Sequence, residues 1–191
     1  MKHHLLPPML LLAVGLFACH TSPVPARPQL PTSRPDATGA APIDCPLHKA
    51  GVDASGLRPF EEVEEYIAFL ERPDRASWQR PNAVVGALHL KGDETVTDVG
   101  AGSGYFSFPL AAALPDGVVR AVDIEPEMIR HIHHRVLDQG IQNLQAVLAT
   151  PDDPQVEADT DLVFMCDVLH HVADREIWLA RLSPADLEKA S

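Results

Sequence analysis

Apolar residues follow two different periods along residues 60–182, and together these periods predict alternating helices and strands. Among the glutamates of residues 60–70, apolar side chains recur every three or four positions, which is the pattern of an amphipathic helix. Four short runs rich in β-branched and other apolar residues have the length and composition of buried strands. These predicted strands are residues 95–99, 118–123, 144–148 and 161–166.

Helical patterns fill the intervals between the predicted strands, and turn residues mark their ends. Pro126 has the position of a helix start, and Gly140 has that of a helix end. The other predicted helices follow Pro81 and cover residues 105–114 and 173–182. Strands that alternate with helices in this way form a parallel, doubly wound sheet. We therefore expect an α/β fold with a mostly parallel sheet and additional N-terminal helices.

The first 19 residues have the features of an export signal. A basic start at Lys2 is followed by an apolar run from Leu5 to Ala18, which is too short to span a bilayer. Residues 16–19, Leu-Phe-Ala-Cys, resemble a lipobox, in which the cysteine becomes the lipidated N-terminus. An ordinary secretory signal is the alternative. Both interpretations predict an exported chain, and the first predicts a lipid anchor at Cys19 on the periplasmic face of a bacterial membrane.

Residues 20–58 are predicted to form a tether between this signal and a folded domain at residues 59–191. Seven prolines lie between residues 20 and 46, together with serine, threonine and alanine. Proline removes backbone hydrogen-bond donors and favours extended polyproline II structure, so this composition is typical of a linker. The remaining length suits one hydrophobic core and not two large domains.

Charge and cysteine content bear on the classes of function. The chain has a net charge of −12 with neutral histidines and no basic stripe, so we expect no nucleic-acid partner. Besides Cys19 the chain has Cys45 and Cys166, and spacing alone does not decide whether these two pair. Cys45 and His48 form a Cys-x-x-His pair, but two ligands do not make a zinc site, and we expect no metal.

A glycine-rich loop follows the first predicted strand of the domain and contains Gly100, Gly102 and Gly104. Glycines between a strand and a helix let the backbone approach a ligand closely. Asp123 lies 23 residues after Gly100, at the end of the next predicted strand, where an acid can bind both hydroxyls of a ribose. The G-x-G-x-x-G pattern of nicotinamide and flavin sites needs glycine at the position of Tyr105, so a nucleotide-dependent oxidoreductase is disfavoured.

Three segments, in order, resemble the motifs of class I methyltransferases, which use S-adenosyl-L-methionine (SAM). The segment from Asp98 to Gly104 resembles their first motif, and Val122 to Met128 resembles their second. Residues 161–171 resemble the fourth-strand motif of the branch that acts on small molecules. The resemblance covers residues 60–182 and implies a Rossmann-like fold. Residues 78–81, Trp-Gln-Arg-Pro, also resemble exported bacterial proteins that are predicted methyltransferases.

The resemblance implies a set of cofactor-binding residues. The glycine loop would wrap the methionine part of SAM, and Asp98 would order that loop and meet the amino group. Asp123 would bind the ribose, with Ile124 against the adenine. Asp152 or Asp153, after the third strand, would meet the adenine amino group.

Three residues after the fourth predicted strand are candidates for the reacting end of the site. By the same resemblance, Asp167 would lie at the mouth of the site, beside the sulfonium. His170 and His171 are open to two interpretations. One of them is a general base for the substrate, because histidine titrates near neutral pH. The other is a pair at a helix start that packs against the sheet.

In-line transfer of a methyl group from SAM to a small molecule or lipid is the activity that the resemblance implies. No Asn-Pro-Pro-aromatic motif follows the fourth strand, which argues against methylation of nucleic-acid bases. Two features favour an alternative function. SAM is a cytoplasmic metabolite whereas the signal predicts export, and the predicted sheet is shortened at its C-terminal side, which leaves an exposed edge. The alternative is a non-catalytic, membrane-anchored lipoprotein that uses the fold as a binding or scaffold module.

Overall fold

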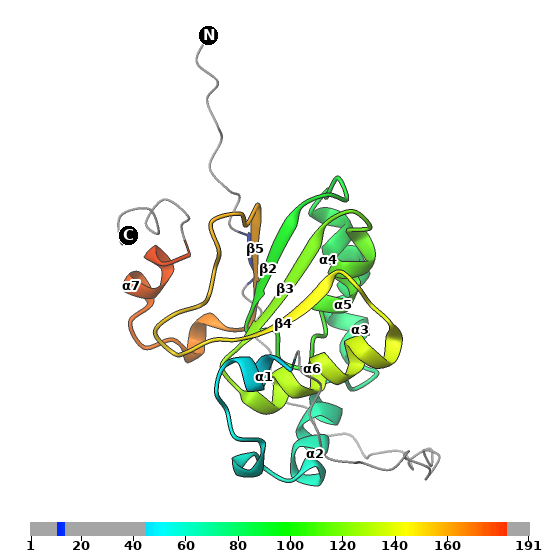
Figure 1. Ribbon diagram of the computed structural model, residues 1–191. Coiled ribbons are helices and arrows are strands. Elements are labelled where there is room, and N and C mark those ends of the chain that lie inside the picture. Colours follow the sequence, from blue (N-terminus) through cyan, green and yellow to red (C-terminus); the bar gives the residue numbers. More distant parts are fainter. Residues whose placement is uncertain (1–10, 14–44, 183–191) are drawn as a thin grey trace.

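A five-stranded parallel sheet forms the centre of the molecule in the computed structural model, which describes residues 11–13 and 45–182 (Figure 1). The strand order is β1-β5-β2-β3-β4, and each neighbouring pair is parallel. The strands are β1 (Leu11–Ala13), β2 (Thr95–Val99), β3 (Val118–Asp123), β4 (Leu144–Leu148) and β5 (Leu162–Cys166). The last four confirm the four predicted strands, and their parallel order confirms the α/β, Rossmann-like fold class.

Helices connect the strands and precede them. They are α1 (Pro46–Lys49), α2 (Phe60–Leu70), α3 (Arg75–Gln79), α4 (Pro81–Ala87), α5 (Ser107–Ala113), α6 (Pro126–Gln139) and α7 (Arg175–Ala180), with 3-10 turns η1 (Ala54–Gly56) and η2 (Leu169–His171). The predicted ends of α6 are confirmed, and Gly140 follows it with a φ of 65°. Helix α5 starts later than predicted, which places Pro109 in the first turn, where its missing N–H interrupts no helical hydrogen bond.

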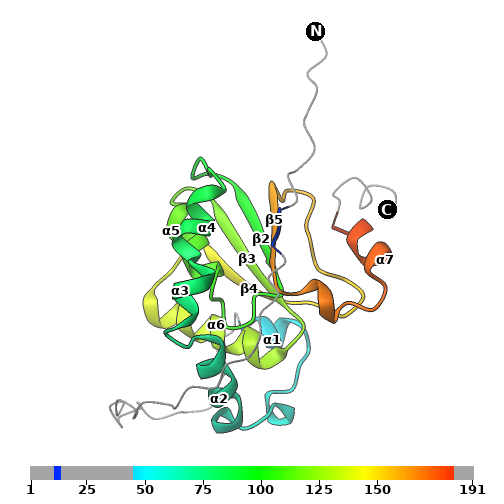
Figure 2. The same ribbon diagram turned by 180° about the vertical axis from the view of Figure 1, so that it is seen from behind.

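The two faces of the sheet are packed by different segments, as successive residues of β5 show. Phe164 belongs to the main core, which also contains Leu110 of α5 and Ile132 of α6. Val163 and Met165 belong to a second core that holds the α7 segment against β2 and β5. Neighbouring strand residues point to opposite faces of a sheet, so β5 contributes to both cores. Figures 1 and 2 accordingly show α7 on the opposite side of the sheet from α4 and α5.

Residues 45–58 differ from the prediction of a tether that extends to residue 58. Cys45 and Leu47 are buried and pack against Ile129 of α6. The backbone N–H and Nε of Arg58 both donate to the buried carboxylate of Glu127, at 3.1 and 3.0 Å. Residues 45–58 therefore pack on the folded domain, through buried apolar side chains and the contacts of Arg58 with Glu127. The predicted tether at residues 20–44 and the lipidation site Cys19 lie outside the described residues.

Replacing Leu47 by alanine is expected to lower the free energy of unfolding by about 2–4 kcal/mol, because the side chain is only 3% exposed and its removal leaves a cavity against α6. Chemical denaturation of the full chain would measure the change. His48 on the same helix is exposed, so His48→Ala serves as the control and is expected to have little effect. Equal stability of Leu47→Ala and the unmodified protein would contradict this packing and support the prediction that residues 45–58 belong to the tether.

Strand β1 lies within the predicted export signal, and it occupies the outer edge of β5. The register pairs Leu11 with Phe164 and Ala13 with Cys166. The sequence predicted an exposed edge on a shortened sheet, and strand edges present unpaired backbone groups. The three residues of β1 pair with backbone groups of β5 and so cover part of that edge. Within the ranges 11–13 and 45–182, no helix is long and apolar enough to cross a membrane.

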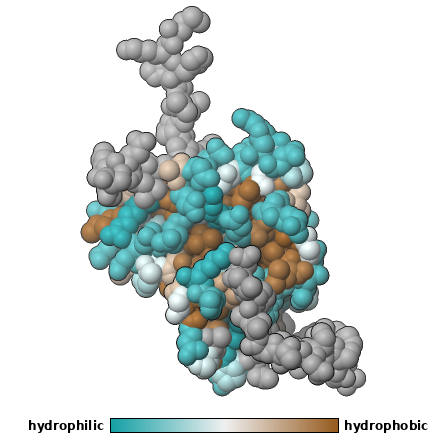
Figure 3. All heavy atoms as spheres, viewed as in Figure 1, coloured by the Kyte–Doolittle hydropathy of each residue, from teal (hydrophilic) through white to brown (hydrophobic). Residues whose placement is uncertain are grey.

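Apolar side chains are exposed in places on a largely hydrophilic surface (Figure 3). Phe69 on α2 is 58% exposed and Ile124, directly after β3, is 49% exposed. Single exposed apolar side chains are common in folded domains. Ile124 differs because it adjoins Asp123 at the end of a central strand, where ligands bind in folds of this kind.

Candidate functional site

Three segments of the predicted site meet at the carboxyl ends of the central strands. The chain order proceeds from β2 outward to β4 and then returns to β5 on the other side of β2. Ligands of open α/β sheets bind at such a reversal of strand order. The glycine loop follows β2, Asp123 ends β3 and Asp167 follows β5. The N–H groups of Gly100 and Ala101 donate to the carbonyl of Val122, at 2.8 and 3.0 Å, which joins the loop to the end of β3.

Asp123 connects the glycine loop to the start of α6. Its Oδ2 accepts a hydrogen bond from the N–H of Gly102 at 2.7 Å, and its Oδ1 accepts one from the N–H of Glu125 at 2.9 Å. A carboxylate has roughly four acceptor positions, so about two remain for a ligand. These are enough for the two hydroxyls of a ribose, and the exposed side chain of Ile124 lies next in the chain. The acid therefore fits the nucleoside part of SAM.

Gly100 and Gly102 shape the loop in different ways, although both have positive φ, of 73° and 56°. A Cβ on Gly100 would lie 2.3 Å from Cγ2 of Val168, so the residue is glycine because the segment after β5 packs on it. A Cβ on Gly102 would meet only Leu70 of α2, at 3.6 Å. The peptide at Gly102 is thus the open part of the loop, as a close approach of a ligand to the backbone requires. Gly104 instead packs near Phe108 and Ile132.

Asp98 lies beneath the loop rather than in it. It is fully buried in β2, and its Oδ2 accepts a hydrogen bond from the hydroxyl of Ser107 at 2.5 Å. This contact fixes the start of α5 and so orders the loop between β2 and α5. Burial raises the pKa of the Asp98 carboxyl to about 7, against the opposing effect of Ser107, and the nearby charge of Asp123 adds to the increase. A direct contact of Asp98 with the cofactor stays a prediction.

The stability of the domain is expected to depend on the protonation of Asp98. The pKa of the Asp98 carboxyl is about 7 in the folded chain, and its ordinary value, which applies to the unfolded chain, is 3.8. The folded chain therefore stays protonated at Asp98 up to a higher pH than the unfolded chain. The resulting stabilisation is complete below about pH 4 and is lost as pH rises to about 7, by on the order of 4 kcal/mol. Asparagine at position 98 does not ionise. Urea unfolding from pH 4 to 8 should therefore show this loss in the unmodified protein and not in Asp98→Asn, and parallel pH profiles would contradict it.

The structure places Asp167 and the two histidines together, in the exposed segment after β5. Asp167 has a φ of 61°, and its Oδ1 lies 3.4 Å from Nδ1 of His170. The rings of His170 and His171 are 3.9 Å apart in η2, and both side chains are exposed. They do not pack against the sheet, so that interpretation of the pair is not what the structure shows. A role as general base stays a prediction, and His170 with Asp167 is the arrangement that suits it.

Asp152 and Asp153 lie in an exposed turn directly after β4. The side chain of Asp153 accepts hydrogen bonds from the backbone and side chain of Gln155, at 2.9 and 2.7 Å, so it stabilises the turn itself. The carbonyl of Asp152 accepts a hydrogen bond from Arg181. The N–H of Ala149 donates to the carbonyl of Asp123 at 2.9 Å, which brings this turn to the same edge of the sheet. Among the described residues, no hydrogen bond or ion pair joins either side chain to the other predicted cofactor residues.

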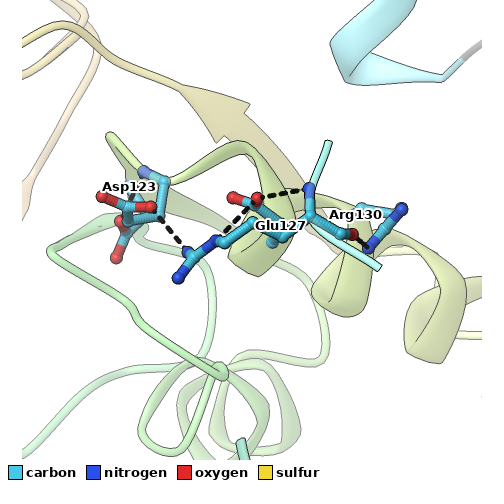
Figure 4. Close-up of polar contacts among 5 residues, drawn as sticks. Asp123, Glu127 and Arg130 are labelled. Carbon is cyan, nitrogen blue, oxygen red and sulfur yellow. Dashed lines mark hydrogen bonds and ion pairs between the residues drawn. The ribbon is translucent and has the colours of Figure 1, made fainter. Parts of the chain in front are cut away.

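Arg58 is a contributor to the site that the sequence analysis did not identify. It donates to Glu127, and its Nη2 also lies 3.1 Å from Oε2 of Glu125, two residues after Asp123 (Figure 4). Its carbonyl accepts a hydrogen bond from Arg130 at 3.5 Å. Arg58 thereby fastens the segment before α2 to the first turn of α6, beside Asp123, the predicted ribose-binding residue. Its partners lie about 70 residues away in sequence, and no local pattern indicates such a pair.

The described residues offer no metal site and no disulfide. Across residues 11–13 and 45–182, no three histidine, cysteine or acidic side chains are grouped so as to hold an ion. Cys45 is buried, and Cys45 and Cys166 are free thiols. Burial raises the pKa of the Cys166 thiol to about 11, which keeps it protonated near neutral pH.

These features define the fold of class I methyltransferases, and residues 97–185 match the family model described as a methyltransferase domain. This part of the chain is similar to SAM-dependent methyltransferases, and SAM is the cofactor of that class. Among solved structures, a SAM-dependent methyltransferase from Aquifex aeolicus superimposes with a TM-score of 0.58 and 26% identity, over 62% of this chain and 64% of that one.

Two curated proteins illustrate the range of relatives. A trans-aconitate 2-methyltransferase of Rhodococcus jostii (strain RHA1) is 29% identical over 101 residues, which are 53% of this chain and 38% of that protein. A tRNA U34 carboxymethyltransferase of Ruthia magnifica subsp. Calyptogena magnifica is 33% identical over 93 residues, which are 47% of this chain and 28% of that protein. The chain thus spans well under half the length of these relatives, and the matches leave its own substrate open.

Proposed function

We propose that the chain transfers a methyl group from SAM to a small molecule. The observation that supports this most directly is the Asp123 carboxylate, which holds the open glycine loop through Gly102 and keeps acceptor positions for a ribose. Bound SAM supplies a methyl group on a sulfonium, which an acceptor nucleophile takes in line as the carbon–sulfur bond breaks and its electron pair returns to sulfur. The chain's own groups bind, orient and desolvate, because the sulfonium is already activated.

The residues after β5 have a separate role in this proposal. Asp167 and His170 lie 3.4 Å apart in the exposed segment that follows Cys166. Here His170 removes a proton from the acceptor when the nucleophile is protonated, and the Asp167 carboxylate stabilises the resulting imidazolium. Val168 between them packs on Gly100, so the glycine loop and this acid–histidine pair hold a fixed relation to each other.

The acceptor that we propose is a small molecule rather than a nucleic acid. One relative is named a trans-aconitate methyltransferase, and another is named a carboxymethyltransferase of tRNA U34. A net charge of −12 opposes the approach of a phosphate backbone, which supports the first class over the second. A lipid acceptor belongs to the same proposal, because an anchored domain would meet lipids at the membrane surface.

Calorimetric titration of S-adenosylhomocysteine into the full chain tests the proposal. Micromolar binding, followed by transfer of a labelled methyl group to a carboxylic-acid library, is the expected result. A folded chain that does not bind S-adenosylhomocysteine would contradict the proposal and support the alternative, a non-catalytic lipoprotein that uses the fold as a binding or scaffold module. Circular dichroism of the same sample would establish that the chain is folded.

Export and lipidation at Cys19 are also proposed, on the strength of residues 1–19. Cleavage before Cys19 would remove Leu11–Ala13, so an exported form would have β5 rather than β1 at the edge of the sheet. Mass spectrometry of the protein from the membranes of its own cells would show a diacylglyceryl group and an N-terminal Cys19. Recovery of the chain with an intact N-terminus in the cytoplasm would contradict export.

A further inference from the structure

Arg75 of α3 lies between two parts of the candidate site. Its guanidinium carbon is 4.1 Å from the ring centroid of Tyr105, the residue directly after the glycine loop. Its Nε donates to Oε1 of Gln79 at 2.5 Å, and Nε2 of Gln79 donates in turn to Sγ of Cys166 at 3.7 Å. Cys166 is the last residue of β5 and immediately precedes Asp167. Helix α3 therefore carries this guanidinium to the edge of the sheet where the acceptor is expected.

The positive charge of Arg75 is half-buried and lacks a carboxylate partner. Among residues 11–13 and 45–182, no acidic side chain lies within ion-pair distance of it, whereas Arg58, Arg72, Arg120 and Arg135 each have one. Burial lowers the pKa of Arg75, which shows that its surroundings disfavour the charge. A guanidinium has five N–H donors. Within the part of the chain that the structure describes, only Nε and Nη1 of Arg75 donate, to Gln79 and to the carbonyl of Leu70.

Tyr105 adds a second polar group without a partner. Its hydroxyl oxygen is buried, and within the described part of the chain it makes no hydrogen bond. Buried polar groups are nearly always hydrogen-bonded, so an unsatisfied phenol beside an unpaired guanidinium needs an explanation. Both groups are donors, and an anion that bridges the remaining N–H groups of Arg75 and the hydroxyl of Tyr105 would satisfy both. Guanidinium groups bind carboxylates through two parallel hydrogen bonds, a geometry that Lys does not offer.

We propose that Arg75, with the hydroxyl of Tyr105, binds a carboxylate group of the methyl acceptor. This inference rests on the proposed function and specifies the substrate class of the same site. Gln79 positions the guanidinium through Nε, and its contact with Cys166 fixes α3 against the end of β5. The carboxylate of the acceptor would be held at Arg75, which places the rest of the acceptor near Asp167 and His170. The negative charge of Asp167 favours an acceptor whose nucleophile, next to Asp167, is neutral or protonated.

Calorimetric titration of trans-aconitate and of its neutral trimethyl ester into the full chain tests this proposal. Each titration is done with and without saturating S-adenosylhomocysteine. The expected result is at least tenfold tighter binding of the acid than of the ester. In Arg75→Met this preference should disappear, while the affinity for S-adenosylhomocysteine stays within twofold of the unmodified protein. Arg72→Met is the matched control, because Arg72 is near Arg75 in sequence and already pairs with Asp74.

Several outcomes would overturn the carboxylate site. Equal binding of acid and ester by the unmodified protein would do so without any variant. Equal losses of affinity for trans-aconitate in Arg75→Met and Arg72→Met would indicate a general electrostatic attraction and not a direct contact with Arg75. Tighter binding of inorganic phosphate than of trans-aconitate would assign the site to another anion. Arg75→Lys keeps the charge, so full binding by this variant would exclude the bidentate contact.

The same experiment separates this proposal from the proposed function. Failure of S-adenosylhomocysteine to bind the folded chain contradicts methyl transfer, and the titrations without it still decide whether Arg75 binds a carboxylate. If Arg75→Met instead lost both S-adenosylhomocysteine binding and thermal stability while the unmodified protein showed no preference for the acid, Arg75 would only fasten α3 to the loop. Thermal unfolding of each variant provides that comparison.

Discussion

Replacing Asp123 by alanine is expected to weaken the binding of S-adenosylhomocysteine at least 100-fold. The carboxylate has room for two ribose hydroxyls in addition to the N–H groups of Gly102 and Glu125. A hydrogen bond to a charged group contributes about 1.5–3 kcal/mol, so the loss of two costs about 3 kcal/mol or more. Because about 1.4 kcal/mol corresponds to a tenfold change in affinity, the effect is two orders of magnitude or larger. Isothermal titration calorimetry would measure it.

Alanine at position 123 also removes the acceptor for the loop, so binding and folding must be measured together. Asp123→Asn retains one carbonyl oxygen for a backbone N–H, and it separates the order of the loop from the charge of the acid. Asp138→Ala is the control, because Asp138 is an exposed acid near the end of α6 and the change in net charge is the same. Undiminished binding by Asp123→Ala would mean that the ribose, and with it the cofactor, is held elsewhere.

The sheet was predictable from sequence because its strands are marked locally. Residues 162–166 are apolar on both faces, as is typical of strands in the middle of a parallel sheet, and residues 95–99 are rich in β-branched side chains. The glycine loop and Asp123 were also predictable, because parallel strands bring their carboxyl ends together without further information. The structure adds the contact between Asp123 and Gly102, which explains why the loop and the acid occur as a pair.

Other parts of the site depend on contacts that local patterns do not reveal. Prolines before residue 46 made residues 45–58 resemble a linker, although Leu47 is buried against α6 and Arg58 pairs with Glu127. The hydrogen bond from Ser107 to the buried Asp98 carboxylate also depends on the assembled fold, while the predicted contact of Asp98 with the cofactor stays a prediction. Helix α3 is five residues long and has no buried side chain, so no apolar period predicts it, and Arg75 was missed with it.

The N-terminal apolar run shows the same limit in another form. A run of this length before a cysteine predicts an export signal, and the composition of β1 is equally suited to a buried strand. Its place on β5 follows from the open edge that the other four strands leave, which is a property of the whole sheet. Sequence patterns therefore identified the apolar segments, but the strands and helices against which these segments pack are determined by the assembled fold.

Replacing Gly100 by alanine is expected to lower the free energy of unfolding by about 2–5 kcal/mol. An alanine in the left-handed region costs about 1–2 kcal/mol, and overpacking of a filled interior costs about 1–3 kcal/mol more. Both apply here, because φ is 73° and the added Cβ would lie 2.3 Å from Cγ2 of Val168. Urea unfolding measures the change, and the loss is a large part of the 5–15 kcal/mol that is typical of a domain.

A double substitution separates the two causes. Val168→Ala removes both Cγ atoms and leaves its Cβ 3.2 Å from the added Cβ at position 100. In the double variant the stability lost to overpacking should therefore be regained, while the cost of the positive φ remains. Gly86→Ala is the control, because Gly86 lies in α4 with open space around it, and there alanine should stabilise the helix by about 0.5–1 kcal/mol. If Gly100→Ala were as well tolerated as Gly86→Ala, or gained nothing from Val168→Ala, the segment after β5 would not pack on the glycine loop. Asp167 and His170 would then have no fixed position beside the cofactor, and the role proposed for them in proton transfer would fail with the contact.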